Sequence, residues 1–365
     1  MEFHNTKLFK KLARFEKDRI FRVFVFTLIL FLVTDIVSSE YMYLKPDEYE
    51  CPLKNKISYV KNSIHGIKKN HDTTKVVFIG DSVFYGLKAC NKQFSIPKIY
   101  QEISGNSISV YDLSLHGSKL SDEYIIMKSV INYSDIIILN INYRFLSDQN
   151  KNPIISHPEL VSQLEFDEED AILLNLKDEE ELLIEEIPVF KNRENIQAFI
   201  FEDHPKKIFE EVKKSISCNY NNYSFCNNEA ENNTIVSFND LSNESKKSVI
   251  DTWTNNTYNL NSTDVNIVYL KKVALLAKTS NATLVIIVNP LNLEMNKEYN
   301  FFNETEHKEN ILFIKSIFNS SVVFIDYTGI NISSFSYYDI DHFTNEGSKV
   351  FAEILYNDTK KYLGE

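Results

Sequence analysis

Three side chains that could carry out nucleophilic catalysis lie in two short motifs at opposite ends of the chain. Ser82 belongs to Gly80-Asp81-Ser82, directly after the apolar run 76–79, and Asp339 precedes His342 by three residues. A serine hydroxyl is a weak nucleophile at neutral pH and needs an imidazole to accept its proton. The imidazole in turn needs a carboxylate on its other nitrogen to hold its tautomer. The two motifs together predict a triad of Ser82, His342 and Asp339.

Each motif also has a purely structural interpretation. Gly80-Asp81-Ser82 could be a strand followed by a helix cap, and residues 341–344 could be the start of a final helix capped by Thr344. The nearby Asp341 is a second candidate for the triad. We expect its side chain to point elsewhere and to cap the helix, because a carboxylate three residues before the histidine is the better placed one. Phe84 excludes the nucleophile-elbow pattern Gly-x-Ser-x-Gly.

Apolar runs alternate with amphipathic segments on both sides of a long central stretch. Strands are expected at residues 76–79, 107–112, 135–141, 282–288 and 321–326, and helices at 83–87, 96–103, 122–130, 265–278, 309–318 and 345–363. Such alternation predicts an α/β fold with a parallel sheet covered by helices on both faces. We therefore expect a doubly wound, flavodoxin-like sheet of five parallel strands.

The motifs in combination resemble those of the SGNH (GDSL-type) hydrolase family. Gly80-Asp81-Ser82 is similar to the first family block, Gly117 to the glycine of the second, and Asn142 to the asparagine of the third. Asp339-x-x-His342 is similar to the last block. The resemblance covers residues 75–144 and 265–363, and a catalytic domain is expected at residues 75–144 and 264–365. The resemblance implies Ser82 as the nucleophile and an oxyanion hole formed by the backbone N–H groups of Ser82 and Gly117 and the side-chain amide of Asn142.

The third block departs from the family pattern at two positions. Asn140 stands where the family has glycine, and Tyr143 stands where it has aspartate. An N-terminal anchor followed by a catalytic domain of this type resembles the DltD-type and alginate-acetylation-type surface acyl-transfer proteins. The layout implies a serine esterase or O-acyltransferase that acts on acyl esters of a surface glycan or glycolipid, with no metal and no cofactor, and with room for a membrane-bound acyl-transfer partner. The alternative is a non-catalytic surface or assembly protein that binds glycan or a partner.

An apolar run at Phe21–Val37 is close to the minimum length that spans a bilayer. The first 22 residues hold seven basic and three acidic side chains. The positive-inside rule then predicts a cytoplasmic tail at residues 1–20, a transmembrane signal anchor at 21–38 and an extracytoplasmic remainder. A buried helix and a signal peptide cleaved near Val37-Ser38-Ser39 are the alternatives.

Two further segments complete the expected organisation. Residues 39–74 are polar and are interpreted as a connector between anchor and domain. Residues 145–263 interrupt the strand–helix rhythm and are interpreted as an acidic, Asn-rich insertion that caps the sheet. Its acidic run is best explained as a solvated helix face rather than as a cation site.

The rest of the composition agrees with export. All four cysteines follow the apolar run, as do eleven Asn-X-Ser/Thr triplets, which is compatible with a glycoprotein. Cys218 could pair with Cys226, and Cys51 with Cys90, or all four could be free buried thiols. The residues after position 22 carry a formal charge of −16, and the basic first 22 residues bring the total for the whole sequence to −12. An acidic body of this kind excludes nucleic acid as a favoured partner, since phosphate contacts need clustered Lys and Arg.

Overall fold

A computed structural model describes most of the domain that carries these motifs. It covers residues 57–86, 94–142, 235–253, 264–318 and 322–363, together with single positions at 157, 160, 164, 260 and 320. The tail and anchor expected at residues 1–38 lie outside the described residues. So do the four cysteines, and with them the two expected pairings. In the part of the chain that is described, no helix is long and apolar enough to cross a membrane.

A five-stranded parallel sheet forms the centre of the fold, as the alternation of apolar runs predicted. Its strands are β1 (Thr74–Ile79), β2 (Ile108–Asp112), β3 (Ile136–Ile141), β4 (Thr283–Val288) and β5 (Val322–Asp326). They are arranged in the order β2-β1-β3-β4-β5, and every neighbouring pair is parallel. This is the flavodoxin-like order, whose direction of winding reverses between β1 and β3. Ligands in such sheets bind at the carboxyl ends of the strands beside that reversal.

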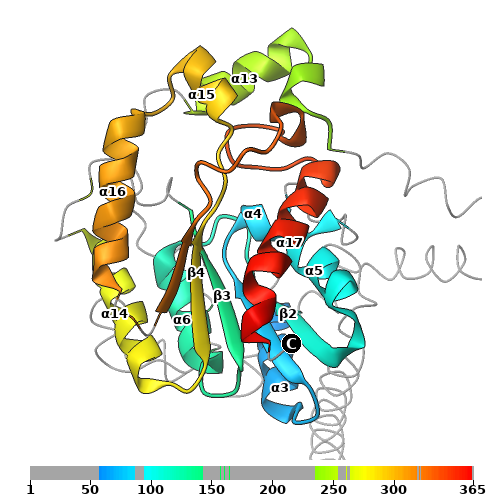
Figure 1. Ribbon diagram of the computed structural model, residues 1–365, viewed down its shortest axis with the longest axis vertical. Coiled ribbons are helices and arrows are strands. Elements are labelled where there is room, and N and C mark those ends of the chain that lie inside the picture. Colours follow the sequence, from blue (N-terminus) through cyan, green and yellow to red (C-terminus); the bar gives the residue numbers. More distant parts are fainter. Residues whose placement is uncertain are drawn as a thin grey trace, which may run out of the picture. The chain divides into compact units, whose positions relative to one another are not determined.

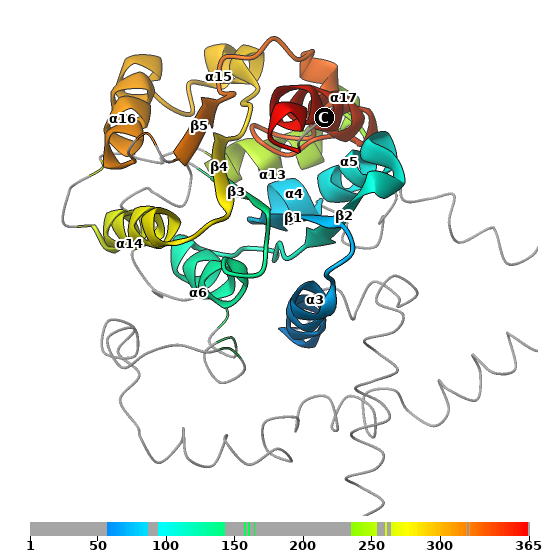
Figure 2. The same ribbon diagram turned by 60° about the horizontal axis from the view of Figure 1, so that its bottom comes forward.

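Helices cover both faces of the sheet (Figures 1 and 2). On one face lie α3 (Ile57–Lys69), α6 (Leu120–Val130) and α14 (Val265–Thr279), with α16 (Glu304–Ile317) beside α14. On the other lie α5 (Ile96–Ser104) and α17 (Asn345–Thr359), which pack against each other. The short α4 (Ser82–Tyr85) follows β1 directly, and α15 (Leu293–Tyr299) follows β4. The carboxyl end of the sheet is therefore occupied by loops and by these short helices.

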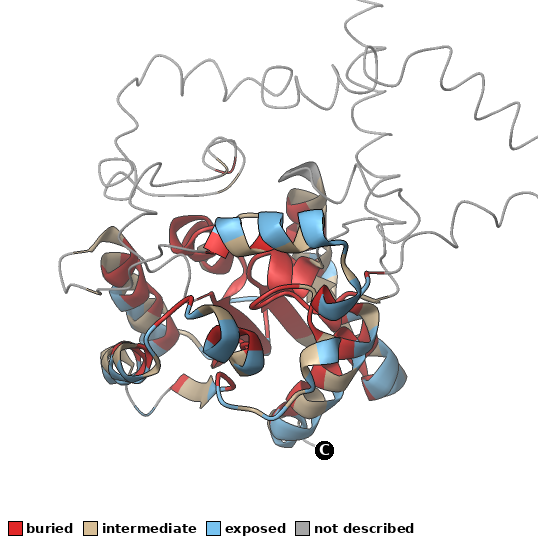
Figure 3. Cartoon of the chain, turned by 90° about the horizontal axis from the view of Figure 1, so that it is seen from above, coloured by how far each residue is buried: buried red, intermediate tan, exposed pale blue. Residues whose placement is uncertain are grey.

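The core is divided in two by the sheet because side chains of a strand alternate between its faces. Val77 and Ile79 of β1 join the cluster that includes α3, α6 and α14, whereas Val76 and Phe78 join the cluster that includes α5 and α17. All six residues of β3 are buried. Figure 3 shows the buried residues concentrated on the sheet and on the inner sides of the helices. Burial on both faces explains why these strands read as continuous apolar runs.

Helix α3 was not anticipated in the segment interpreted as a polar connector. Val60, Ile64 and Ile67 are spaced by four and three residues, so they share one side of the helix, and all three are buried in the core. Ser63, between them, is buried as well, whereas Lys69 at the end of the helix is exposed. The end of the expected connector is therefore part of the folded domain.

Other differences concern helix ends. The expected helix 309–318 begins five residues earlier, because the Asn303 side chain accepts hydrogen bonds from the backbone N–H groups of Thr305 and Glu306. The final helix ends at Thr359 and continues as a single 3-10 turn, Lys360–Tyr362. These shifts leave the order of elements unchanged.

The end of the expected insertion packs onto the domain. Residues 235–253 contain a 3-10 turn, Phe238–Asp240, and helix α13 (Asn243–Trp253). The backbone N–H of Phe238 donates to the carbonyl of Tyr337, 2.9 Å away, in the segment that leads to Asp339. Trp253, the only tryptophan of the chain, is buried in the core. In Figure 1, α13 and α15 lie at the end of the sheet where α4 follows β1.

Candidate active site

Ser82 is held at the carboxyl end of β1 by a tight turn. A Cβ atom on Gly80 would lie 3.0 Å from both Asn140 Cβ and the Phe84 ring, so any larger residue would require one of these neighbours to shift. Helix α4 then begins at Ser82, and the Asp81 carboxylate caps it by accepting from the backbone N–H of Val83, 3.0 Å away. The helix-cap interpretation of this motif is therefore correct, and it does not compete with a chemical role for Ser82.

The loop that carries His342 is folded around the Asp339 carboxylate. Oδ1 of Asp339 accepts from the backbone N–H groups of Asp341, at 3.0 Å, and of His342, at 2.8 Å. Around this turn, the N–H of Tyr338 donates to the carbonyl of His342 at 2.8 Å. The N–H of Asn292, in the loop after β4, donates to the carbonyl of Ile340 at 2.8 Å. The position of His342 is thus fixed from within the loop and from β4.

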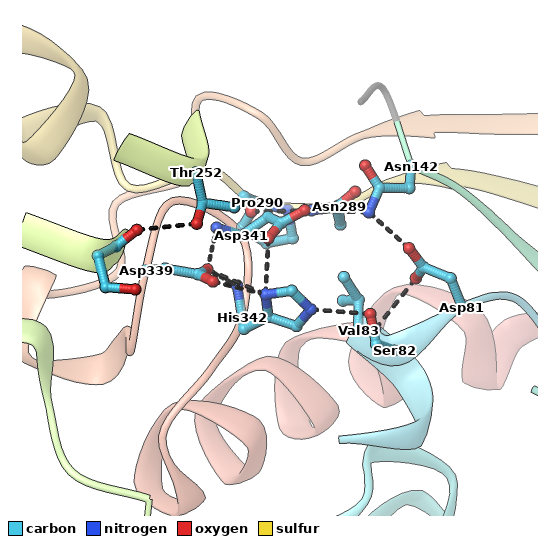
Figure 4. Close-up of polar contacts among 11 residues, drawn as sticks. Asp81, Ser82, Val83, Asn142, Thr252, Asn289, Pro290, Asp339, Asp341 and His342 are labelled. Atoms are coloured by element: carbon cyan, nitrogen blue, oxygen red, sulfur yellow. Dashed lines mark hydrogen bonds and ion pairs between the residues drawn. The ribbon is translucent and has the colours of Figure 1, made fainter. Parts of the chain in front are cut away.

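Ser82 and His342, separated by 260 residues in the chain, are in direct contact (Figure 4). Ser82 Oγ lies 2.8 Å from His342 Nε2, and both residues are buried. On the other side of the ring, His342 Nδ1 lies 2.8 Å from Asp339 Oδ2 and 3.0 Å from Oδ1. Carboxylate oxygens accept hydrogen bonds, so Nδ1 carries a proton, and Nε2 can accept the Ser82 proton whenever the ring is neutral. The structure brings together the three residues expected to form a triad.

The expectation for Asp341 was wrong: its side chain points into the site. Asp341 Oδ1 lies 2.9 Å from His342 Nδ1, as an ion-pair contact rather than an aligned hydrogen bond. The single Nδ1 proton is directed to Asp339 instead. Helix α17 is capped by Thr344, whose Oγ1 accepts from the backbone N–H of Gly347 at 3.1 Å. The hydrogen bonds from two successive backbone N–H groups to Asp339 curl the loop, and this turns Asp341 inward.

The charges in this cluster are strongly coupled. Burial by itself lowers the pKa of His342, but the negative charges of Asp339 and Asp341 outweigh it and hold that pKa well above its usual value. Burial opposes ionisation of Asp339, yet His342 and the hydrogen bonds to the carboxylate lower its pKa. Burial, and then the charge of Asp341, raise the pKa of Asp81 to about 6. The site therefore favours an imidazolium, the species formed when a serine hydroxyl gives up its proton.

Gly117 lies in a loop tied to the Ser82 turn. The N–H of Leu115 donates to the carbonyl of Gly80 at 3.0 Å, and Ser118 Oγ donates to the same carbonyl at 2.8 Å. Gly117 itself has a φ of 71°, in the left-handed region that favours glycine. These bonds bring the loop after β2 next to the loop after β1, as the expected oxyanion role of Gly117 requires.

Asn142 follows β3 at the same edge, but its amide is already engaged. Nδ2 donates to Asp81 Oδ2 at 2.5 Å and to Asp341 Oδ2 at 3.0 Å, so both amide hydrogens face carboxylates. Asn140, which replaces the family glycine, donates from Nδ2 to Asp81 Oδ1 at 3.2 Å. Both asparagines of this strand end thus bind the Asp81 carboxylate. The oxyanion role expected of Asn142 remains a prediction.

A buried carboxyl group behind the Gly117 loop was missed in the sequence. Ser118 Oγ donates to Glu123 Oε1 at 3.1 Å and to the Gly80 carbonyl at 2.8 Å. The hydroxyl has a single proton, so these two acceptors share it. Burial, together with the charges of Asp81 and Asp122, raises the pKa of Glu123 well above its usual value. A charged residue at the start of a helix normally indicates a solvated cap, so the burial of Glu123 could not be predicted from its position in the chain.

Asp339, Asp341 and His342 also bring two carboxylates and an imidazole as close together as metal ligands would be. His342 Nδ1 lies 2.8–3.0 Å from the carboxylate oxygens, the distance of an N–H···O contact, so this nitrogen is occupied by a proton shared with Asp339. With Nε2 on Ser82, every ring nitrogen has a partner. We therefore interpret the cluster as a proton-transfer site.

Similarity of this chain to known proteins is found only among solved structures. No protein-family model matches the chain, and no curated protein matches it. Twelve chains of solved structures do match. One, from Streptococcus pneumonia and provisionally described as a platelet activating factor, is 12% identical over 85% of this chain and 94% of that chain, with a TM-score of 0.36.

Proposed function

We propose that this protein is a serine esterase or O-acyltransferase of the SGNH type, with Ser82 as nucleophile, His342 as general base and Asp339 as the residue that orients the imidazole. The observation that carries this proposal is the 2.8 Å contact between Ser82 Oγ and His342 Nε2, with the Asp339 carboxylate 2.8 Å from Nδ1. Nucleophile, base and orienting acid in hydrogen-bond sequence are the signature of acyl transfer through a covalent intermediate.

The reaction follows from this arrangement. Ser82 Oγ attacks the acyl carbon as its proton passes to His342 Nε2, and the carbonyl oxygen becomes an oxyanion. The tetrahedral intermediate collapses when Nε2 returns the proton to the leaving alcohol, which leaves an acyl ester on Ser82. Water or a second hydroxyl then gives its proton to Nε2 as it attacks the ester, and Nε2 returns that proton to Ser82 Oγ when the second tetrahedral intermediate collapses. Water gives a carboxylic acid, and a sugar hydroxyl gives a new ester.

Backbone N–H groups of Ser82 and Gly117 are the proposed donors to the oxyanion. Losing one such donor typically costs on the order of 10²–10³ in rate. Asn142 would join them only by giving up one of its two carboxylate partners, Asp81 or Asp341. We therefore assign the oxyanion hole to the backbone N–H groups of Ser82 and Gly117.

The proposed substrate is an acyl ester of a surface glycan or glycolipid. This part of the proposal is supported by the apolar run at residues 21–38 with its basic N-terminal side and by the resemblance to anchored acyl-transfer proteins. Protease added to sealed vesicles should then digest residues after Ser39 and spare residues 1–20. Recovery of the full chain in the supernatant after membranes are sedimented would contradict the anchor and the surface substrate together.

Turnover of an activated acetate ester by the full chain tests the catalytic part. Ser82→Ala should reduce kcat by at least about 10³-fold. Ser114→Ala is the matched control, since Ser114 is also buried after a strand at this edge and its Oγ has no hydrogen-bond partner among the described residues. Equal activity of wild type and Ser82→Ala would contradict the proposal. Transfer is distinguished from hydrolysis by adding an oligosaccharide and measuring the ratio of new ester to free acetate.

A further inference from the structure

We propose that Asp341 is a second positioning carboxylate for His342, held against the imidazole by Asn142 and, through Asn142, by Asp81. The inference rests on the proposed function, because it assigns a role within the same site. A Ser-His-Asp triad has one carboxylate at the imidazole, whereas in this site two carboxylates face the same imidazole nitrogen, Nδ1 of His342.

The first support is the geometry at Nδ1. Asp339 and Asp341 approach this atom from the same loop, with their nearest oxygens 2.8 Å and 2.9 Å away. Asp341 is 1% exposed, and water does not screen a charge so placed. A buried carboxylate without a cation or hydrogen-bond donor is strongly unfavourable. The position of Asp341 is therefore explained only by the partners it has, His342 on one oxygen and Asn142 on the other.

The second support is the bridge to the nucleophile turn. Asn142 Nδ2 donates both to Asp341 Oδ2, at 3.0 Å, and to Asp81 Oδ2, at 2.5 Å. Asp81 precedes Ser82 and caps its helix. One amide thus connects the base of the site to the turn that carries the nucleophile. A substitution of Asn142 should therefore change the titration of His342 through its effect on Asp341.

The groups that act electrostatically on His342 come from three loops. Asp339 and Asp341 belong to its own loop, Asp81 follows β1, and His116 follows β2. Three of the four are carboxyl groups, so the surroundings favour the protonated ring. Removing the charge of Asp341 should make the imidazolium less stable. The ring should then lose its proton at lower pH, and it should also be a weaker base.

Titration of His342 by NMR in the full chain, labelled at its eight histidines, measures this without requiring activity. Asp341→Asn keeps the size of the side chain and removes its charge. We expect the pKa of His342 to fall, the acid limb of kcat/KM to move to lower pH, and kcat at the plateau to fall about tenfold, as loss of an interaction with a charged group implies. Asp326→Asn, at the end of β5, is the matched control and should change none of these.

Asn142→Ala tests the connection that Asn142 makes between Asp341 and Asp81. It also provides an independent test of the role of Asp341 if Asp341→Asn does not fold. As the holder of Asp341, Asn142 should change the pH profile in the same direction as Asp341→Asn, and the two changes combined should be less than additive. A pure oxyanion donor would lower kcat about 10²–10³-fold, leave the titration of His342 unchanged, and add fully to Asp341→Asn.

The outcomes separate this inference from the proposed function. A His342 titration and pH profile that are unchanged in Asp341→Asn would overturn the role of Asp341, whatever the activity. If instead the titration shifts while the wild-type chain turns over no ester, the positioning role stands and the proposed function fails. Additive effects of Asn142→Ala and Asp341→Asn would overturn the bridge.

Discussion

Two groups of buried acidic residues near Ser82 differ in the partners that their carboxyl groups contact. Asp339 and Asp341 face the imidazole of His342, and the histidine lowers the pKa of Asp339 in spite of its burial. Glu123, on the other side of the Ser82 turn, has a serine hydroxyl as its partner, and burial raises its pKa well above the usual value. Both groups lie at the same edge of the sheet.

This contrast shows that the partner of a buried carboxyl group, as well as its burial, sets the direction of its pKa shift here. Beside His342, the carboxylates stabilise the charge that appears on the imidazole as Ser82 loses its proton. Behind Gly117, Ser118 Oγ donates to the Glu123 carboxyl group and to the Gly80 carbonyl, which holds two loops together. One group should therefore control rate, and the other should control stability.

The largest expected effect follows from neutralising Asp339. Asp339→Asn keeps the shape of the side chain but presents an amide that can hold the wrong tautomer of His342, and in a serine protease the equivalent change lowers turnover about 10⁴-fold. Since Asp341 remains beside Nδ1, we expect a loss of about 10³–10⁴-fold in kcat, measured with an acetate ester. A larger loss in Asp341→Asn at equal stability would reverse the assignment of the two aspartates.

Neutralising Glu123 should affect stability and its pH dependence instead. In the folded chain the pKa of Glu123 is raised, so wild type loses stability as the pH rises above about 4.5, where Glu123 ionises in the unfolded chain but stays protonated in the folded one. Glu123→Gln removes this penalty and can still accept from Ser118. Its unfolding free energy, followed by Trp253 fluorescence in urea, should exceed that of wild type by on the order of a few kcal/mol at pH 8 and converge with it near pH 4.

A stability difference between Glu123→Gln and wild type that does not depend on pH would contradict the neutral state of Glu123. A loss of kcat as large as that of Asp339→Asn would break the division of roles between the two acidic groups.

The smallest effect is expected at the helix cap beside the His342 loop. Thr344→Ala removes the Oγ1 acceptor for the backbone N–H of Gly347 and should cost about 1 kcal/mol of unfolding free energy. The carboxylates that face His342 are untouched, so the pH dependence of kcat/KM should match that of wild type. A shifted pH profile would show that the cap and the charged cluster are not independent.

Much of the fold was predictable because its signals are local. Strands buried on both faces must be continuous apolar runs, and β3 and β4 are so in the sequence. The serine and the Asp-x-x-His motif were also predictable, since each sits at a strand end or just before a helix. Helix α3 was missed because its apolar residues are sparse among polar ones and its role is to cover the sheet.

The rest depends on contacts between distant segments. The direction of Asp341 is set by two backbone N–H groups that bind Asp339, and spacing along the chain does not contain that turn. The partners of Asn142 come from residues 61 and 199 positions away. The raised pKa of Glu123 follows from its burial and from the charge of Asp81, which belongs to another segment of the chain. Such features appear only once the loops are assembled.

Covalent labelling with a fluorophosphonate tests the central claim most directly, because such probes phosphonylate a serine that is activated by a neighbouring base. We predict one adduct on the wild-type chain, mapped to Ser82 by mass spectrometry, and none on Ser82→Ala. The labelling rate should rise with pH as His342 loses its proton, with an acid limb above the usual range of histidine. A folded wild-type chain that forms no adduct, or an adduct that persists in Ser82→Ala, would contradict the account.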